Sequence, residues 1–426
     1  MAEQITFKAK GREPPSQRYQ TCRRMLVGPW CNQPEQYEGY NGFVGWAGVT
    51  RLRSGRWLCA FSSGYWHGSP PWTDAIRQDA ACRKEFEYYR SLGCMDIRCP
   101  RGGRAHVMHS DDHGLTWSTP AVLVDTDLDD RHPTILELDD GTWLCTFFSQ
   151  ALPHVNITRW MLSHDAGRTW SEPVNLPPQH TIGFGAGPAI QLADNTILWV
   201  GEGRFDPKVD HQTIGVFRSK DRGRTFSLHG VITCDHEMNE PTIAQLPDGR
   251  LVMMVRVQGD VSFSTDHGRS WTLPVATGVK MSDPHLLRLP NGVLACFHAG
   301  WGVGGVRVIL SPDNGRTWHG PAETYGYAVD PGAYGYSHPM LLPDGTVYIV
   351  YQQNAGVRAH DARTEAIWGL VVRVHDNAAG IDILPAPGSP ASAGTNVSGL
   401  AAQNPTAGYL EEGDKIGKDN EQTGER

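Results

Sequence analysis

Ionisable and aromatic residues recur at the start of six similar strand-like segments of this 426-residue chain. The positions are Trp46, residues 130–132, residues 185–187, Asn239 with Glu240, Asp283 with His285, and residues 334–338. Carboxylates, imidazoles, guanidinium groups and phenols can transfer protons, attack carbon and hold a charged ligand. Burying such groups without partners is costly, so we expect a binding or catalytic site if the fold brings them together.

Each of these segments reads as the first strand of a β-hairpin. A turn pair such as Asp-Gly or Asn-Gly follows it, and then a second apolar strand. The turn positions are residues 55, 141, 195, 249, 292 and 345. The first gap is longer than the second by about thirty residues, and the excess falls at residues 64–100, where residues 79–90 could form a short helix. Such an insertion is either a lid or pocket wall, or a solvated surface excursion.

An octapeptide of the form Ser-x-Asp-x-Gly-x-Thr/Ser-aromatic occurs five times. Its copies are residues 110–117, 163–170, 219–226, 264–271 and 311–318. The Asp can accept hydrogen bonds from turn amides, the Gly can take a positive φ, and the aromatic ring can enter the core. The spacing of 45 to 56 residues predicts propeller blades or another array.

Six hairpins and five octapeptides predict an all-β, six-bladed propeller of four-stranded antiparallel blades. We expect the octapeptide to join strands three and four of each of the first five blades. Blade six should take its third strand from residues 367–374 and its outer strand from the N-terminus, near residues 24–28. That closure would tie the two ends of the chain into one ring.

The octapeptide is the Asp-box, and the chain resembles the sialidase-like (neuraminidase) propellers over about residues 40–375. The resemblance implies an exo-acting glycoside hydrolase that removes a terminal acidic sugar, such as a sialic acid, without a cofactor or metal. It implies a tyrosine nucleophile activated by a glutamate, three arginines that hold the substrate carboxylate, and an aspartate as acid/base. A neutral phenol approaches such an anionic substrate with less repulsion than a carboxylate would.

Four residues match the family's site in the family's order. Glu240 in Asn-Glu-Pro-Thr matches the glutamate, and Arg256 on the next strand matches the second arginine. Arg307, just before the fifth Asp-box, resembles the third arginine, and Tyr336 in Gly-Tyr-Ser-His-Pro matches the nucleophile. The structural alternatives are an ion pair across a hairpin for Glu240 and Arg256, and a packed core side chain for Tyr336.

The chain departs from the family's pattern at the first arginine. Trp46 stands in that arginine's place, and Gln352 replaces the carboxylate that would pair with it. Arg131 could supply a guanidinium from the neighbouring blade. We expect the acid/base aspartate in the inserted residues 64–100, with Asp74 as the first candidate. The alternatives are Asp79, Glu85 and Asp96.

Three histidines, His132, His285 and His338, could form hydrogen bonds with sugar hydroxyls or act as acid or base. Taken singly, each is more typical of a packing or hydrogen-bonding residue. Two other functions therefore stay open. One is a non-catalytic carbohydrate-binding propeller, which the substitutions at Trp46 and Gln352 favour. The other is a polysaccharide lyase that uses His and Tyr. A hydrogen bond between Tyr336 and Glu240 at the mouth would favour the hydrolase.

Composition limits the partners and the domains. The net charge of −8 argues against nucleic acid as a partner, and no apolar stretch is long enough to span a membrane. The first ten residues lack an apolar h-region, which favours the cytoplasm unless a signal has been removed. The nine Cys predict buried thiols rather than disulfides or a zinc site. We expect one domain over residues 1–384 and a flexible tail over residues 385–426; the oligomeric state is left open.

Overall fold

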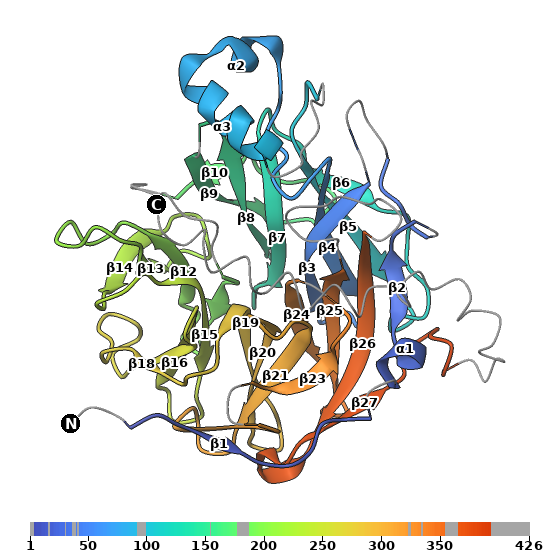
Figure 1. The fold of residues 1–426 in the computed structure, drawn as a ribbon, viewed down its shortest axis with the longest axis vertical. Coiled ribbons are helices and arrows are strands. Elements are labelled where there is room, and N and C mark those ends of the chain that lie inside the picture. The colour runs from blue at the N-terminus through green and yellow to red at the C-terminus, as the bar shows by residue number, and fades with distance from the viewer. Residues whose placement is uncertain are drawn as a thin grey trace.

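Six antiparallel β-sheets stand around a common axis as the blades of a propeller (Figure 1). The structure is a computed structural model, and it describes residues 4–15, 18–29, 31–35, 40, 42–91, 99–153, 155–176, 187–322, 325–333, 335–353 and 365–392, apart from the side chains of residues 88 and 89. The six-bladed, all-β fold predicted from the hairpins and Asp-boxes is confirmed.

Four blades are four-stranded sheets that follow the chain in order. Blade one holds β3 (Phe43–Arg51), β4 (Trp57–Gly64), β5 (Arg104–Ser110) and β6 (Ala121–Val124). Blade two holds β7 (Asp129–Glu137), β8 (Trp143–Ala151), β9 (Val155–Ser163) and β10 (Val174–Asn175). Blade three holds β11 (Ile190–Gln191), β12 (Ile197–Gly203), β13 (Thr213–Ser219) and β14 (Ser227–Ile232). Blade four holds β15 (Asn239–Gln245), β16 (Leu251–Arg256), β17 (Asp260–Ser264) and β18 (Val275–Ala276).

The last two blades carry extra strands that join distant parts of the chain. Blade five holds β19 (Met281–Arg288), β20 (Leu294–Gly300), β21 (Val306–Ser311) and β22 (Thr317–Gly320), with β23 (Tyr327–Asp330) on β21 and β1 (Thr6–Ala9) parallel to β22. Blade six holds β24 (Ser337–Leu341), β25 (Val347–Gln353) and β26 (Ala366–Val374), with β2 (Arg24–Val27) and β27 (Ile381–Leu384) on β26. The pairing of β2 with β26 confirms the predicted closure of the ring by residues near 24–28.

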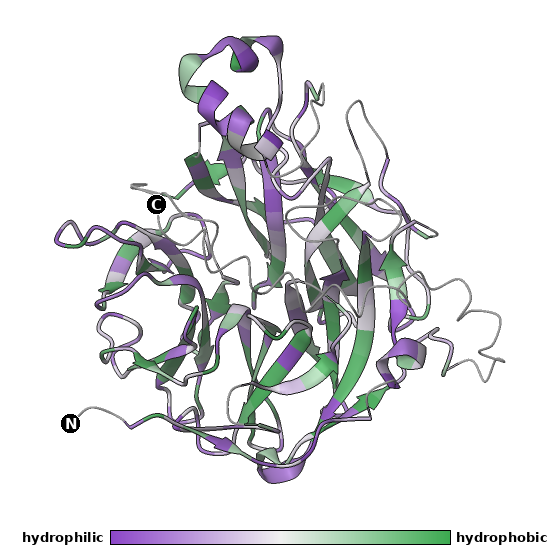
Figure 2. Ribbon diagram, in the orientation of Figure 1, coloured by the Kyte–Doolittle hydropathy of each residue, from purple (hydrophilic) through white to green (hydrophobic). Residues whose placement is uncertain are grey.

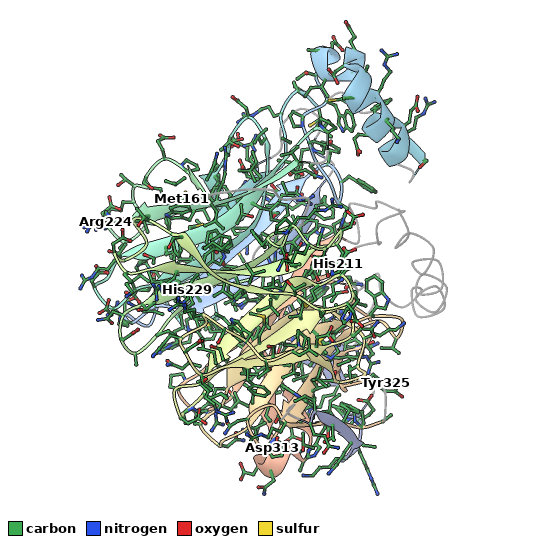
Figure 3. The ribbon with its side chains drawn as sticks, turned by 90° about the vertical axis from the view of Figure 1, so that its left-hand side faces the viewer. Met161, His211, Arg224, His229, Asp313 and Tyr325 are labelled. Atoms are coloured by element: carbon green, nitrogen blue, oxygen red, sulfur yellow. The ribbon has the colours of Figure 1, made fainter. Side chains whose placement is uncertain are left out.

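Each Asp-box joins the third and fourth strands of its blade, as predicted. In the first box Asp112 accepts hydrogen bonds from the amide of Thr116 (2.8 Å) and from the hydroxyl of Ser110 (2.8 Å). His113 and Gly114 both have positive φ, 57° and 86°, as a tight turn of this kind requires. Arg224 of the third box lies on the opposite side of the ring from His211 and Tyr325 in the side view (Figure 3).

The core lies between neighbouring sheets, where the strands carry most of the apolar residues (Figure 2). Of the Asp-box aromatics, Trp318 is fully buried, Phe226 is buried, and the other three are half-buried. The eight Cys in the described part of the chain are free thiols. Burial raises the pKa of the Cys59 thiol to about 12, so it is neutral and inert.

The insertion in blade one forms a helical arm that projects from the ring and is largely hydrophilic (Figures 1 and 2). It holds α2 (Asp74–Gln78) and α3 (Ala80–Ser91), and the predicted helix at residues 79–90 corresponds to α3. Trp72 packs edge-on against Phe86 at its base, with ring centroids 4.9 Å apart. The other short helices are α1 (Arg18–Cys22) and the 3-10 turn η1 (Asp376–Ala378).

The beginning of the expected C-terminal tail is attached to the ring. The amide of Ala386 donates to the carbonyl of Cys22 (2.8 Å), and that of Ala391 donates to Thr21 (3.0 Å). The remainder of the expected tail, residues 393–426, lies outside the described residues. None of the helices in the described part of the chain has the length and apolar character needed to cross a membrane.

Candidate functional site

Four inner strands carry a β-bulge at the same point near the mouth of the ring. The bulged residues are Trp46, His132, Glu240 and Asp283, and their φ angles are 48°, 52°, 46° and 47°. In β15, for example, Glu240 and Pro241 together face Val255 of β16. A left-handed conformation costs a non-glycine residue roughly 1 kcal/mol, and such bulges re-aim side chains next to functional sites. The sequence therefore places strained backbone where its ionisable residues meet.

The backbone N–H of every bulged residue donates to a side chain of the preceding blade. The acceptors are Gln352 for Trp46 (2.5 Å), Ser62 for His132 (2.8 Å), Glu202 for Glu240, and Glu240 for Asp283 (2.7 Å). We call these contacts the inter-blade latches. They satisfy amides that the bulges remove from the strand ladder, and they fix each bulge against its neighbour.

Tyr336, Glu240 and Arg256 form one hydrogen-bonded group. The Tyr336 hydroxyl donates to Oε1 of Glu240 at 2.6 Å, and Nη1 of Arg256 donates to the same oxygen at 2.5 Å. Nη1 of Arg256 also lies 3.4 Å from the Tyr336 hydroxyl. With the latch to Asp283 on Oε2, three different donors surround the carboxylate of Glu240. The sequence analysis assigned Tyr336, Glu240 and Arg256 to one site, and in the structure the three side chains are in contact.

Burial and the charge on Glu240 raise the pKa of Tyr336 well above its ordinary value, so the phenol is neutral. Burial opposes the charge on Arg256, but Glu240, Tyr336 and Glu202 raise its pKa above the usual range, so it stays cationic. The arrangement is a neutral phenol hydrogen-bonded to a carboxylate that can accept its proton, with a fixed cation beside both. This is what general-base activation of a phenol requires.

Trp46 and Arg131 form a second wall of the mouth. The guanidinium carbon of Arg131 lies 3.9 Å from the centroid of the Trp46 ring, and Nη1 is 3.3 Å from Asp129. Trp46 also approaches the rings of Tyr336 (6.1 Å) and His67 (4.9 Å). Burial lowers the pKa of His67 to about 3, and the charges of Arg131 and Arg256 contribute to this shift. The imidazole is therefore neutral at pH 7.

The three predicted histidines surround Asp283. Nε2 of His285 is 3.2 Å from one oxygen of Asp283, and Nε2 of His132 is 4.0 Å from the other. The ring of His338 is 4.8 Å from that of His285, and its Nδ1 accepts from the amide of Val49 at 3.4 Å. Burial lowers the pKa of His132 and His338, so both imidazoles are neutral. Burial opposes the charge on Asp283, but His285 lowers its pKa, so it stays ionised.

Two of the predicted site residues, Arg307 and Asp74, form no hydrogen bond with Tyr336, Glu240 or Arg256 in the described part of the chain. Arg307 donates to the carbonyls of Gly304 (3.0 Å) and Gly326 (3.0 Å) and is 3.4 Å from Glu13 of the N-terminal segment. Asp74 is the first residue of α2 and is exposed on the projecting arm (Figure 1).

Two of the alternatives to Asp74 belong to the same arm. Asp79 is exposed and accepts from the amides of Ala81 and Cys82 at the start of α3, and Glu85 lies in the middle of that helix. Asp96 and the mouth residues 185, 186 and 334 lie outside the described residues.

Sequence reasoning did not find three residues of the mouth. Glu202 is the penultimate residue of β12, in Gly-Glu-Gly, and His67 lies in the insertion. The ring of Trp301 lies 4.8 Å from the guanidinium carbon of Arg256. Glu202 could have been found by aligning the second strands of the hairpins, because it acts as Ser62 and Gln352 do in their blades. No comparable repeat marks His67 or Trp301.

The comparisons with known proteins agree with this architecture. The family model of the BNR repeat-like domain matches residues 105–349. A sialidase of Bacteroides fragilis is 24% identical over 217 residues, which is 45% of this chain and 38% of that protein. The chain thus spans well under half the length of this curated relative.

Solved structures share the fold at low sequence identity. A protein of unknown function from Dyadobacter fermentans has a TM-score of 0.60 at 17% identity, covering 85% of this chain and 99% of that one. A Hadza microbial sialidase has a TM-score of 0.54 at 17% identity, covering 82% and 68%. A Trypanosoma rangeli sialidase in complex with sialic acid has a TM-score of 0.52 at 13% identity, covering 82% and 58%. The chain belongs to the BNR repeat-like domain family and is a distant homologue of the sialidases, with their six-bladed propeller.

Proposed function

We propose that the protein is an exo-acting glycoside hydrolase that removes a terminal acidic sugar of the sialic acid class from a glycoconjugate. The observation that carries the proposal is the 2.6 Å hydrogen bond from Tyr336 to Glu240, with Arg256 beside both. A similar trio of Tyr351, Asp330 and Arg23 is fully buried and structural. The group around Tyr336 differs because it lies at the mouth, where Tyr336 is half-buried and Arg256 and Glu240 keep 20% and 10% exposure. A phenol that must become a nucleophile needs a base within hydrogen-bond reach.

In this mechanism the Tyr336 oxygen attacks the anomeric carbon while Glu240 takes the phenolic proton. The bond to the leaving oxygen breaks, and an acid protonates that oxygen. Water then attacks the anomeric carbon and gives a proton to the conjugate base of that acid. The bond from the anomeric carbon to Tyr336 breaks, Glu240 returns its proton to the phenolate, and the sugar leaves with its configuration retained. Asp74 remains the candidate for the acid, and it would have to approach the mouth together with the arm that carries it.

The substrate carboxylate would bind to Arg256 and Arg131. The buried Nε of Arg256 has no hydrogen-bond partner among the described residues, so a donor is left for a ligand. Arg131 lies on the face of Trp46, which stands where the family's first arginine would be. Two guanidinium groups can hold a carboxylate through charge-assisted hydrogen bonds. Arg307 is the weaker partner, because Glu13 and two carbonyls already engage it.

The test is the release of fluorophore from a sialoside and from a panel of uronides by wild type, Tyr336→Phe and Tyr348→Phe. Tyr348 is a matched control, because it is a fully buried tyrosine whose hydroxyl has no hydrogen-bond partner in the described part of the chain. We expect release by wild type and Tyr348→Phe, and a loss of more than about a thousandfold in Tyr336→Phe. Release that survives in Tyr336→Phe would reject the nucleophile and leave the histidines, as in the lyase mechanism.

A carbohydrate-binding propeller without turnover is the second candidate. Trp46 stands in the place of the family's first arginine, and the side chain of Gln352 accepts a hydrogen bond from its backbone amide. Arg307 is already paired with Glu13. A site with only part of the carboxylate clamp could bind an acidic sugar and not process it. No release from any substrate, together with binding that Arg256→Ala abolishes, would establish this function instead.

A further inference from the structure

His132, Asp283 and His285 form a cluster of metal-ligating groups that the proposed hydrolysis does not use. Their ligand atoms all lie within 4.8 Å of one another. His132 belongs to blade two, and Asp283 and His285 belong to blade five. In a ring of six these blades face each other, so the cluster spans the axis of the propeller.

The polar atoms of this cluster lack the partners that burial demands. Asp283 and His285 are 4% and 3% exposed. Oδ2 of Asp283 and Nε2 of His285 are buried and have no hydrogen-bond partner among the described residues. They lie 3.2 Å apart and can pair with each other when His285 is protonated, but neither has a further partner among the described residues. Leaving two such atoms unsatisfied is costly, so a further group is expected to bind between them.

The geometry fits a metal ion as that group. Two ligand atoms bonded at about 2.1 Å to one ion, with an angle near that of a tetrahedron, lie about 3.4 Å apart. The separation of Asp283 Oδ2 from His285 Nε2 is already close to this value. Nε2 of His132 lies 4.0 Å from the other carboxylate oxygen and needs only a small ring movement to complete the set.

We propose that His132, Asp283 and His285 bind a divalent first-row transition-metal ion, such as Zn²⁺, on the propeller axis. Two imidazoles and one carboxylate are ligands that these ions prefer, and three protein ligands leave a coordination position open. The ion would connect two opposite blades. It would also fix Asp283, whose backbone amide holds Oε2 of Glu240.

The test measures the metal directly, without an enzymatic assay. The purified full chain is stripped with a chelator, dialysed and titrated with Zn²⁺ and Co²⁺, with metal content read by mass spectrometry and Co²⁺ ligation by visible absorption. We expect one ion per chain, and a melting temperature raised by roughly 3 °C when the ion is at a hundred times its Kd.

Variants assign the ion to its ligands. His285→Gln and Asp283→Asn should each lower the affinity at least tenfold and remove the Co²⁺ spectrum. The matched control is His236→Gln, because Cys234, Asp235 and His236 form a second, more exposed group with similar ligand spacing. That control should keep the ion.

Two results would overturn the proposal. One is wild-type protein that takes up less than a fifth of an equivalent of either metal. The other is uptake that His236→Gln abolishes and His285→Gln leaves unchanged, which would place the ion at the surface group. Neither result depends on whether the protein hydrolyses a glycoside, so the metal site and the proposed function can fail separately.

Discussion

Replacing Glu240 by Gln should destabilise the protein more than replacing Tyr336 by Phe, although both remove the proposed acid–base pair. Glu240 accepts from Tyr336 and Arg256 on Oε1 and from the amide of Asp283 on Oε2. A Gln amide must turn its NH₂ group toward one of these sides. In one orientation the NH₂ group meets the two donors on the Oε1 side, Tyr336 and Arg256, and in the other it meets the backbone N–H of Asp283, so either orientation sets a donor against a donor.

The size of the effect follows from the ion pair. Removing one partner of a fully buried pair costs about 3–5 kcal/mol. The side chains of Arg256 and Glu240 keep 20% and 10% exposure, so we take the lower end, about 3 kcal/mol. At about 2.1 cal/mol/K per residue, the unfolding entropy of this chain is about 0.9 kcal/mol/K, and the melting temperature should fall by about 3 °C.

Tyr336→Phe is the matched comparison. It removes one hydrogen bond and leaves the charge pair of Glu240 and Arg256 intact, so it should cost about 1 kcal/mol, or about 1 °C. Differential scanning calorimetry at pH 7 measures both variants. A Glu240→Gln protein that melts within 1 °C of wild type, or above Tyr336→Phe, would refute the assignment of Glu240 as a charged acceptor of three hydrogen bonds.

Three further changes test other parts of the ring. Gln352→Ala leaves the buried amide of Trp46 without its acceptor, so it should cost about 1–3 kcal/mol, measured as a fall in melting temperature. Asp330→Asn breaks the fully buried pair with Arg23 (2.9 Å), and a loss of about 3–5 kcal/mol is expected in the same assay. For Asp266 burial opposes ionisation, but hydrogen bonds from the Asp-box lower the pKa to about 2 from 3.8, so its stabilisation is complete above pH 3.8 and disappears as the pH falls through 2. The difference in melting temperature between wild type and Asp266→Asn should therefore shrink between pH 4 and pH 2.

Controls and contrary outcomes are available for each of these. Gln78→Ala removes an exposed glutamine of the arm and should leave the melting temperature unchanged. Gln352→Ala behaving like Gln78→Ala would show that the Trp46 amide finds another acceptor. An Asp330→Asn protein as stable as wild type would mean that Arg23 is satisfied without its partner. A difference for Asp266→Asn that persists at pH 2 would mean that the carboxylate contributes through shape rather than charge.

Much of the fold could be predicted because its signals are local and repeated. Each Asp-box and each Asp-Gly turn specifies its own hairpin, and six copies in order determine the ring. The trio of Tyr336, Glu240 and Arg256 was also predictable, because the resemblance to the sialidases matches each of them to a site residue of that family. The repeat alone places Glu240 and Tyr336 near the start of an inner strand and says nothing of Arg256.

The surroundings that the sequence did not reveal depend on contacts between distant segments. Arg307 lies on the expected strand, but Glu13, from the start of the chain, engages its guanidinium. Asp74 is in the expected insertion, yet the helices of that insertion project from the ring, and no repeat indicates their direction. The bulges could not be predicted for a different reason. The left-handed backbone of Glu240 results from a shift in the register of β15 against β16, and residue types alone do not specify that register.

The inter-blade latches constrain the mouth through their acceptors rather than through the bulged residues. Each latch joins a backbone N–H, which every residue except proline supplies, to a side-chain oxygen of the blade before it. The acceptor positions are 352, 62, 202 and 240. Among homologues, these positions should keep a side chain with an oxygen acceptor, even in relatives that have lost catalysis. Proline should be excluded from positions 46, 132, 240 and 283.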